Sequence, residues 1–130
     1  MSMLKKHNPE HIIKPYAAYS QGVEVPPNAR WLHVAGQVGV KRDGSLAGDP
    51  EAQVQTAWQN VLEVLTAANM AAEDLVSVNI YITDAKDAEL NRDYYGRMTK
   101  GVRPAVTMVT VKRLSNPDWI VEIEAIAAKV

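Results

Sequence analysis

Apolar residues recur along this chain with two different periods, and the change of period marks the elements. Over residues 51–68 they recur every three or four positions, which places them on one face of an α-helix. Asp49 is a favoured helix-capping residue type, and Pro50 suits the first helical position. The pattern predicts an amphipathic helix over residues 51–68.

Strict alternation of apolar and polar residues marks the strands. Residues 76–84 alternate in this way, which is typical of a strand with one buried face. Apolar segments bounded by turn residues predict further strands over 18–25, 31–40, 105–114 and 120–128. We expect the first two of these to pair as a hairpin around Pro26-Pro27-Asn28. Residues up to Pro15 are polar, which is typical of irregular structure or an edge strand.

A second, shorter helix is predicted over residues 88–98, with Gly101 and Pro104 ending it. The element order is then β-β-α-β-α-β-β, which is typical of an α+β fold in which both helices pack on one face of a mixed sheet. The other face would be uncovered, and large apolar surfaces are seldom left exposed on monomers. The pattern therefore predicts that this face meets a ligand, solvent or, most economically, another copy of the chain.

The composition is that of one folded domain over residues 1–130, with 47% apolar and 22% charged residues. A net charge of −1 lacks the positive field expected of a nucleic-acid-binding protein. The absence of cysteine excludes disulfides and thiolate chemistry, and the three histidines show no metal-ligand spacing. Without an apolar run of signal-peptide or membrane-spanning length, a cytoplasmic location is expected and a membrane partner is not.

Two glutamates are the unusual feature of the last predicted strand. Alternation puts Glu122 and Glu124 on one face, while the apolar residues between them form the other face. Because the apolar face must be core, the glutamates line the opposite face. They are either the solvated side of a strand or carboxylates of a cleft that transfer protons, and spacing does not separate these readings.

Five segments together resemble the Rid family, also called the YjgF/RidA or endoribonuclease L-PSP family, from about Tyr16 to Ala127. They read AYSQGV, HVAGQVGV, LNRDYYGRM, RPAVTMVTVKRL and VEIEAIA. The resemblance implies a chorismate-mutase-like fold assembled as a homotrimer, with a central barrel and clefts between subunits. It also implies the activity of the family's best-characterised members, which hydrolyse reactive enamines and imines, such as 2-aminoacrylate, to ketoacids and ammonia without a metal or organic cofactor.

The same resemblance maps the family's cleft onto this chain. Glu122 matches the glutamate expected to hold the reacting water, and so is the predicted catalytic residue. Tyr19 matches the cleft tyrosine and Asn91 the asparagine of the second helix. The S-G-Q turn of the family is matched by Ala35, Gly36 and Gln37.

Val106 is the main departure from the family pattern. Deaminating members read P-A-R where this chain reads Pro104-Ala105-Val106, and that arginine would pair with a substrate carboxylate. Met108 makes the same wall more apolar. The cleft is therefore predicted to disfavour a small amino-acid-derived carboxylate. Arg103 lies off the Val106 face by strand alternation, and we expect it to be a solvated surface residue.

Two functions from different classes fit these residues. The first is an imine or enamine hydrolase of altered range, in which Glu122 activates water. The second is a trimer that binds a small metabolite for regulation without turning it over. RNA cleavage ranks last, because the chain has neither a cluster of basic residues nor a histidine pair for acid and base work.

Overall fold

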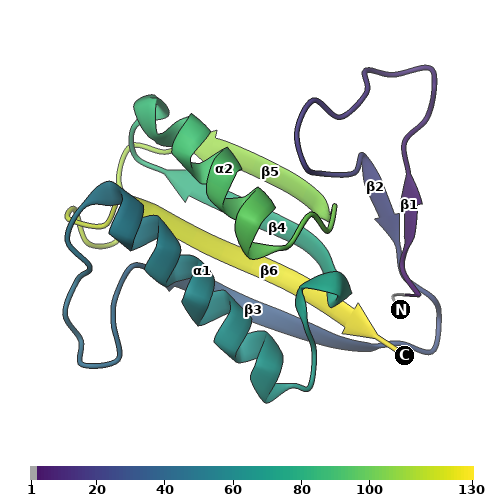
Figure 1. The fold of residues 1–130 in the computed structure, drawn as a ribbon, viewed down its shortest axis with the longest axis horizontal. Coiled ribbons are helices and arrows are strands. Elements are labelled where there is room, and N and C mark those ends of the chain that lie inside the picture. Colours follow the sequence, from purple (N-terminus) through teal and green to yellow (C-terminus); the bar gives the residue numbers. More distant parts are fainter. Residues whose placement is uncertain (1–2) are drawn as a thin grey trace.

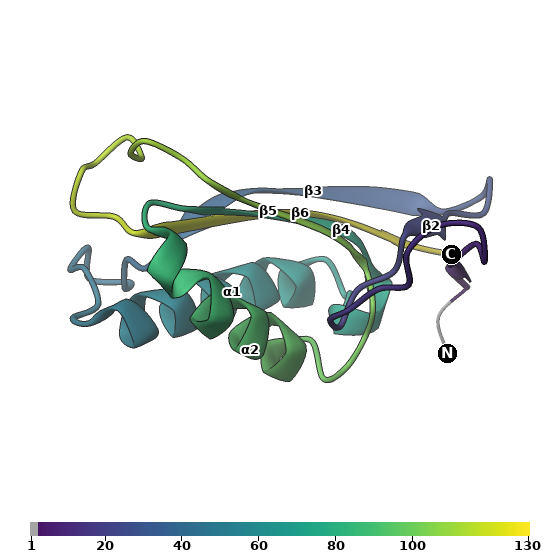
Figure 2. The same ribbon diagram turned by 90° about the horizontal axis from the view of Figure 1, so that it is seen from above.

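The structure of the chain, a computed structural model, describes residues 3–130 and consists of a mixed sheet with two α-helices on one face (Figures 1 and 2). The elements in chain order are β1 (Lys5–His7), β2 (Gly22–Glu24), β3 (Arg30–Val38), α1 (Pro50–Ala67), the short 3₁₀ helix η1 (Ala72–Asp74), β4 (Leu75–Ile82), the 3₁₀ helix η2 (Ala85–Asp87), α2 (Ala88–Met98), β5 (Ala105–Thr110) and β6 (Val121–Lys129). The predicted α+β class is confirmed.

The main sheet has the strand order β3-β6-β4-β5. The last strand, β6, therefore lies inside the sheet and pairs antiparallel with both β3 and β4. Strand β5 is an edge strand and pairs parallel with β4, because the chain returns through α2 between them. Although β5 and β6 follow one another in sequence, β4 separates them.

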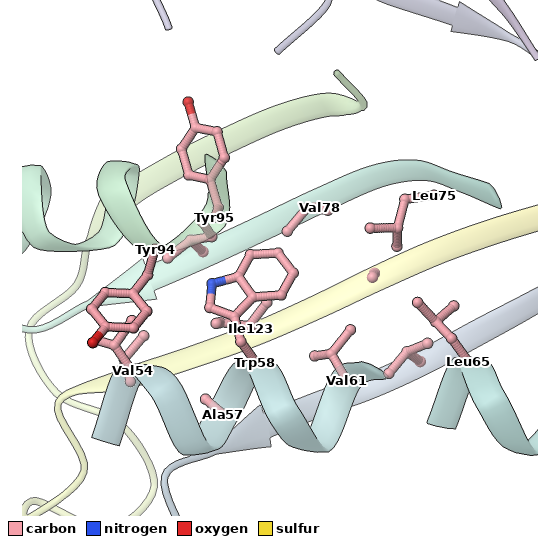
Figure 3. Close-up of a cluster of buried hydrophobic side chains, with 14 of the residues drawn as sticks. Val54, Ala57, Trp58, Val61, Leu65, Leu75, Val78, Tyr94, Tyr95 and Ile123 are labelled. Carbon is pink, nitrogen blue, oxygen red and sulfur yellow. The ribbon is translucent and has the colours of Figure 1, made fainter. Parts of the chain in front are cut away.

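Helix α1 forms where the apolar period predicted it. Its first turn is capped by the Asp49 carboxylate, which accepts a hydrogen bond from the Ala52 backbone N–H at 2.8 Å. Its apolar side chains point at the sheet, and Trp58 and Leu65 are completely buried. Figure 3 shows this row of side chains against Val78 and Ile123 of the sheet. Burial of this face holds α1 in place.

Helix α2 packs beside α1 on the same face of the sheet, as the predicted layout requires (Figure 2). The Tyr94 hydroxyl donates a 2.6 Å hydrogen bond to the Glu51 carboxylate of α1. In Figure 3 the Tyr94 ring lies beside Val54, and Tyr95 projects away from it. The helix ends before Lys100 and Gly101, which adopt positive φ angles of 55° and 76°.

The predicted hairpin between residues 18–25 and 31–40 is wrong. Strand β2 pairs instead with β1 in a separate two-stranded sheet, and β3 pairs with β6 (Figure 1). Consecutive prolines at 26 and 27 remove two N–H donors from the connection. The segment before β2 is instead hydrogen-bonded to the start of β5, through Ser20. Within residues 3–130, no helix has the length and apolar character needed to cross a membrane.

Candidate functional site

A pocket of about 270 Å³ opens between the edge strand β5, helix α2 and the segment before β2. Val106 and Met108 point into the helix side of the sheet, because they are the register partners of the buried Val78 and Ile80. The pocket is lined by Tyr16, Ala17, Tyr19, Gln21, Arg92, Tyr95, Val106 and Met108. The structure thus brings together three predicted cleft residues, Tyr19, Val106 and Met108.

Ser20 fixes the position of Tyr19 over β5. Its backbone N–H donates to the Pro104 carbonyl at 2.9 Å, and its hydroxyl donates to the Arg103 carbonyl at 2.5 Å. Arg103 in turn donates from Nη1 to the Ala17 carbonyl at 3.2 Å. Arg103 is exposed, as predicted, and it holds the Tyr19 segment rather than lining the pocket.

Tyrosine rings form much of the pocket wall. The Tyr16 and Tyr19 rings meet edge to face, with centroids 5.9 Å apart. Burial raises the pKa of the Tyr95 hydroxyl above its ordinary value, and the nearby Arg92 guanidinium opposes that rise. Tyr95 is therefore a neutral hydrogen-bond donor at neutral pH.

Asn91 is not among the residues that line this pocket. The residue has no exposed surface, and its Nδ2 donates to the Asp87 carbonyl at 3.0 Å. Its Oδ1 has no hydrogen-bond partner among residues 3–130. In this conformation Asn91 secures the first turn of α2 and does not reach a ligand in the pocket.

Glu122 lies on the opposite face of the sheet, directly over Gly36. A Cβ atom built at Gly36 would be only 2.8 Å from the Glu122 carboxyl carbon. The β3–β6 register shifts between Val34 and Gln37, so the segment predicted as a turn is a β-bulge within β3. Gln37 donates from Nε2 to the Ala35 carbonyl at 3.1 Å. The bulge and the absence of a side chain at Gly36 make room for the Glu122 carboxylate.

Glu124 lies on the same face of the sheet as Glu122, the open face, which no helix within residues 3–130 covers. It belongs to a polar cluster that the sequence analysis did not predict. Its Oε1 accepts hydrogen bonds from the Tyr81 hydroxyl at 2.6 Å and from Asn79 Nδ2 at 3.1 Å. The hydrogen bond to Glu124 is the main cause of the raised pKa of Tyr81. Asn79 and Tyr81 are the polar positions of the β4 alternation, but only the strand order shows that they face the glutamates.

The sheet therefore divides the predicted residues into two groups within one chain. Tyr19, Val106 and Met108 are on the helix face, and Glu122 and Gly36 are on the open face. Glu122 and Gly36 do not line the pocket that contains Tyr19, Val106 and Met108. Among residues 3–130, no group of three or more His, Asp or Glu side chains is placed to hold a metal ion.

The comparisons with known proteins agree with the fold. The family model described as Endoribonuclease L-PSP matches residues 9–129. A RutC family protein of Aquifex aeolicus is 39% identical over 121 residues, which cover 88% of this chain and 91% of the relative. The crystal structure of YyfB, a Rid-family protein of Yersinia pestis, is similar with a TM-score of 0.86 and 30% identity, covering 97% of this chain and 98% of that one. Escherichia coli TdcF, which carries the name of a candidate reactive intermediate deaminase and was crystallised with bound serine, has a TM-score of 0.73 and 28% identity, covering 92% and 91%.

Proposed function

Because this chain belongs to the endoribonuclease L-PSP family, also called the Rid family, we propose that it hydrolyses reactive imines or enamines in a cleft between two of its subunits. The observation that carries the proposal is the pocket in which Tyr19, Val106 and Met108 meet. These positions match the family's cleft, and the name of TdcF supports the same reaction class. No cofactor is required for this reaction.

The two-sided arrangement supports a site shared between subunits. The pocket opens at the sheet edge beside β5, while the open face carries Glu122 together with exposed apolar groups such as Trp31 (54% exposed) and Val109 (43% exposed). Covering that face with a second copy would bury these groups and bring Glu122 of one subunit towards the pocket of another. We propose that the copies form the homotrimer implied by the resemblance.

The proposed reaction needs only water and a positioned carboxylate. Glu122 holds a water molecule and accepts its proton as the oxygen attacks the imine carbon. Glu122 passes this proton to the imine nitrogen, which gives the carbinolamine. Glu122 then takes the proton of the new hydroxyl group and delivers it to nitrogen as the C–N bond breaks, so that one water and one imine become one carbonyl compound and one ammonia. Glu122 ends in its starting state.

Val106 alters which imines the cleft accepts. In a partly desolvated site, a guanidinium at this position would form a charge-assisted, bidentate pair with a substrate carboxylate, and valine offers no equivalent. Hydrolysis of 2-aminoacrylate, a small imine precursor with its carboxylate beside the reacting carbon, should therefore not exceed the rate in buffer. Imines with an apolar body should be better substrates because Met108 and Val106 form an apolar wall.

The test compares imines generated in the assay with and without a carboxylate beside the reacting carbon. We expect wild-type protein to accelerate release of ammonia from apolar imines, and Glu122→Gln to abolish this acceleration. Glu63→Gln, an exposed glutamate on α1, is the matched control and should have no effect. Val106→Arg should gain activity on 2-aminoacrylate. Folded protein that accelerates neither kind of imine, before and after Val106→Arg, would refute a hydrolase.

A second function, metabolite binding without turnover, is favoured by the same Val106 and Met108 wall. If the cleft only stores or senses a ligand, then a metabolite panel should raise the unfolding free energy while Glu122→Gln leaves this rise unchanged. A ligand present at 100 times its dissociation constant stabilises by about 2.7 kcal/mol, which thermal shift measurements detect readily. Stabilisation combined with no hydrolysis would identify this second function.

A further inference from the structure

Among residues 3–130, Arg92 is the only charged residue that lines the pocket. Arg92 belongs to α2 and is exposed to solvent. Within residues 3–130, no carboxylate forms an ion pair with it, and the adjacent Asp93 is paired with Arg97 at 3.0 Å. A guanidinium without a protein partner is free to bind an anion that enters the pocket.

The neighbours of Arg92 are suited to a planar or apolar ligand body. Tyr16, Tyr19 and Tyr95 contribute aromatic surface, and the half-buried Val106 and Met108 contribute an apolar floor. Among residues 3–130 of one chain, no residue that lines this pocket carries a negative charge. Arg92 and Tyr95 both line the pocket, and the positive charge of Arg92 opposes the rise that burial causes in the pKa of the Tyr95 hydroxyl.

The element that carries the arginine, β5 or α2, decides where in the pocket a carboxylate can bind. An arginine at position 106 would rise from the strand and hold a carboxylate at the floor of the pocket, beside the reacting group. Arg92 instead belongs to the helix and is solvent-accessible, so it can hold a carboxylate only at the rim. A ligand that uses both surfaces must have its carboxylate and its buried end separated by an apolar body.

We propose that Arg92 is the anion-binding, specificity-determining residue of this pocket, and that it selects ligands with a carboxylate at one end of an apolar or aromatic body. This inference rests on the proposed function only in taking the Tyr19–Val106–Met108 pocket as the ligand site. Position 106 of β5 carries valine where an arginine is expected from the family pattern. Arg92 of α2 would supply a positive charge to the pocket in its place. Short ligands such as 2-aminoacrylate would reach either the floor or Arg92, and not both.

The test measures equilibrium binding of three probes that share one phenylpropyl body. Phenylpropionate carries a carboxylate, phenylpropionamide is its neutral analogue, and phenylpropylamine is its cationic analogue. We expect wild-type protein to bind phenylpropionate about tenfold more tightly than the amide, equivalent to about 1.4 kcal/mol. This preference should fall with rising salt concentration, because Arg92 is exposed.

Three variants locate the preference at one side chain. Arg92→Gln should bind phenylpropionate and phenylpropionamide equally, and Arg92→Glu should prefer phenylpropylamine. Arg97→Gln, which removes another exposed arginine of α2 that does not line the pocket, should keep the wild-type preference. Any one of three results would overturn the inference. Wild-type protein could bind the acid and the amide equally, Arg92→Gln could keep the wild-type preference for the acid, or wild-type protein could fail to bind phenylpropionate at millimolar concentration.

Because the probes cannot be hydrolysed as imines, this experiment is independent of the proposed reaction. Loss of acid preference in Arg92→Gln without any imine hydrolysis would uphold Arg92 and refute the hydrolase. Hydrolysis that depends on Glu122, combined with an unchanged acid preference in Arg92→Gln, would refute the role of Arg92 alone.

Discussion

Gly36 and Gly39 lie three residues apart, and alanine at the two positions should have opposite consequences. A Cβ atom at Gly36 would be 2.8 Å from Cδ and 3.0 Å from Cγ of Glu122. A Cβ atom at Gly39 would be 2.6 Å from Cα and 2.8 Å from the carbonyl oxygen of Gln53, in the first turns of α1. The first obstacle is the end of a flexible side chain, and the second is helix backbone.

The structural cost of Gly36→Ala should be small. Non-bonded carbon atoms prefer separations of about 3.5–4.0 Å, so the Glu122 carboxylate must move by roughly 1 Å. An unfavourable rotamer costs about 0.5–1.5 kcal/mol, whereas replacing glycine by alanine at a compatible φ stabilises by about 0.4–1 kcal/mol. Gly36 does not have a positive φ angle. The two effects nearly cancel, and the free energy of unfolding should change by less than about 1 kcal/mol.

The functional cost of the same substitution should be large. A displacement of about 1 Å in a catalytic group can lower a rate about a hundredfold. Under the proposed function, Gly36→Ala is therefore expected to lower imine hydrolysis by about that factor while retaining the Glu122 charge. Gly39→Ala should instead lose about 1–3 kcal/mol of stability, because α1 must shift away from the end of β3.

Urea denaturation followed by tryptophan fluorescence measures the stability of both variants, and ketoacid or ammonia release measures hydrolysis. Gly48→Ala is the matched control, because no atom lies within 4 Å of its built Cβ, and it should match wild type in both assays. The reasoning fails if Gly36→Ala hydrolyses imines at the wild-type rate, or if it loses as much stability as Gly39→Ala.

Two further predictions concern parts of the fold away from Gly36. Asp49→Ala removes the cap that accepts the Ala52 N–H, and should lower the unfolding free energy by about 1 kcal/mol in urea denaturation; an unchanged midpoint would contradict the cap. The pKa of Tyr81 is raised mainly by its hydrogen bond to Glu124, so Glu124→Gln should lower it towards the ordinary value in an ultraviolet titration, and an unshifted titration would refute that cause. Because the folded pKa is the raised one, the stability that Tyr81 contributes is complete below its unfolded pKa of about 10 and is lost as pH rises through the folded value.

Local patterns predicted most of the elements because their causes are local. The apolar period of α1, its Asp49 cap and the alternation of β4 are properties of neighbouring residues, and the structure confirms all three. The hairpin prediction failed because it paired β2 with the next strand in sequence. Which strands pair depends on the packing of the whole sheet. The two prolines after β2 were the available signal against it.

The sequence predicted which residues belong to the candidate site, but not on which face of the sheet each of them lies. Alternation correctly put Glu122 on the face opposite the core, but it did not show that Val106 faces the core side with the helices. Arg92 was missed because nothing in its helical spacing distinguishes it from a solvated arginine. Asn91 was assigned to the cleft, but in the structure it is completely buried and does not line the pocket.

What the sequence by itself determined is the class of fold and the resemblance to the family. These follow from periodicities and residue identities that neighbouring positions already contain. The strand order β3-β6-β4-β5, the approach of Glu122 to Gly36 and the entry of Arg92 into the Tyr19 pocket were decided only in the folded chain. Each of them depends on contacts between residues far apart in sequence, and such contacts are selected by joint burial of the whole core rather than by local preference.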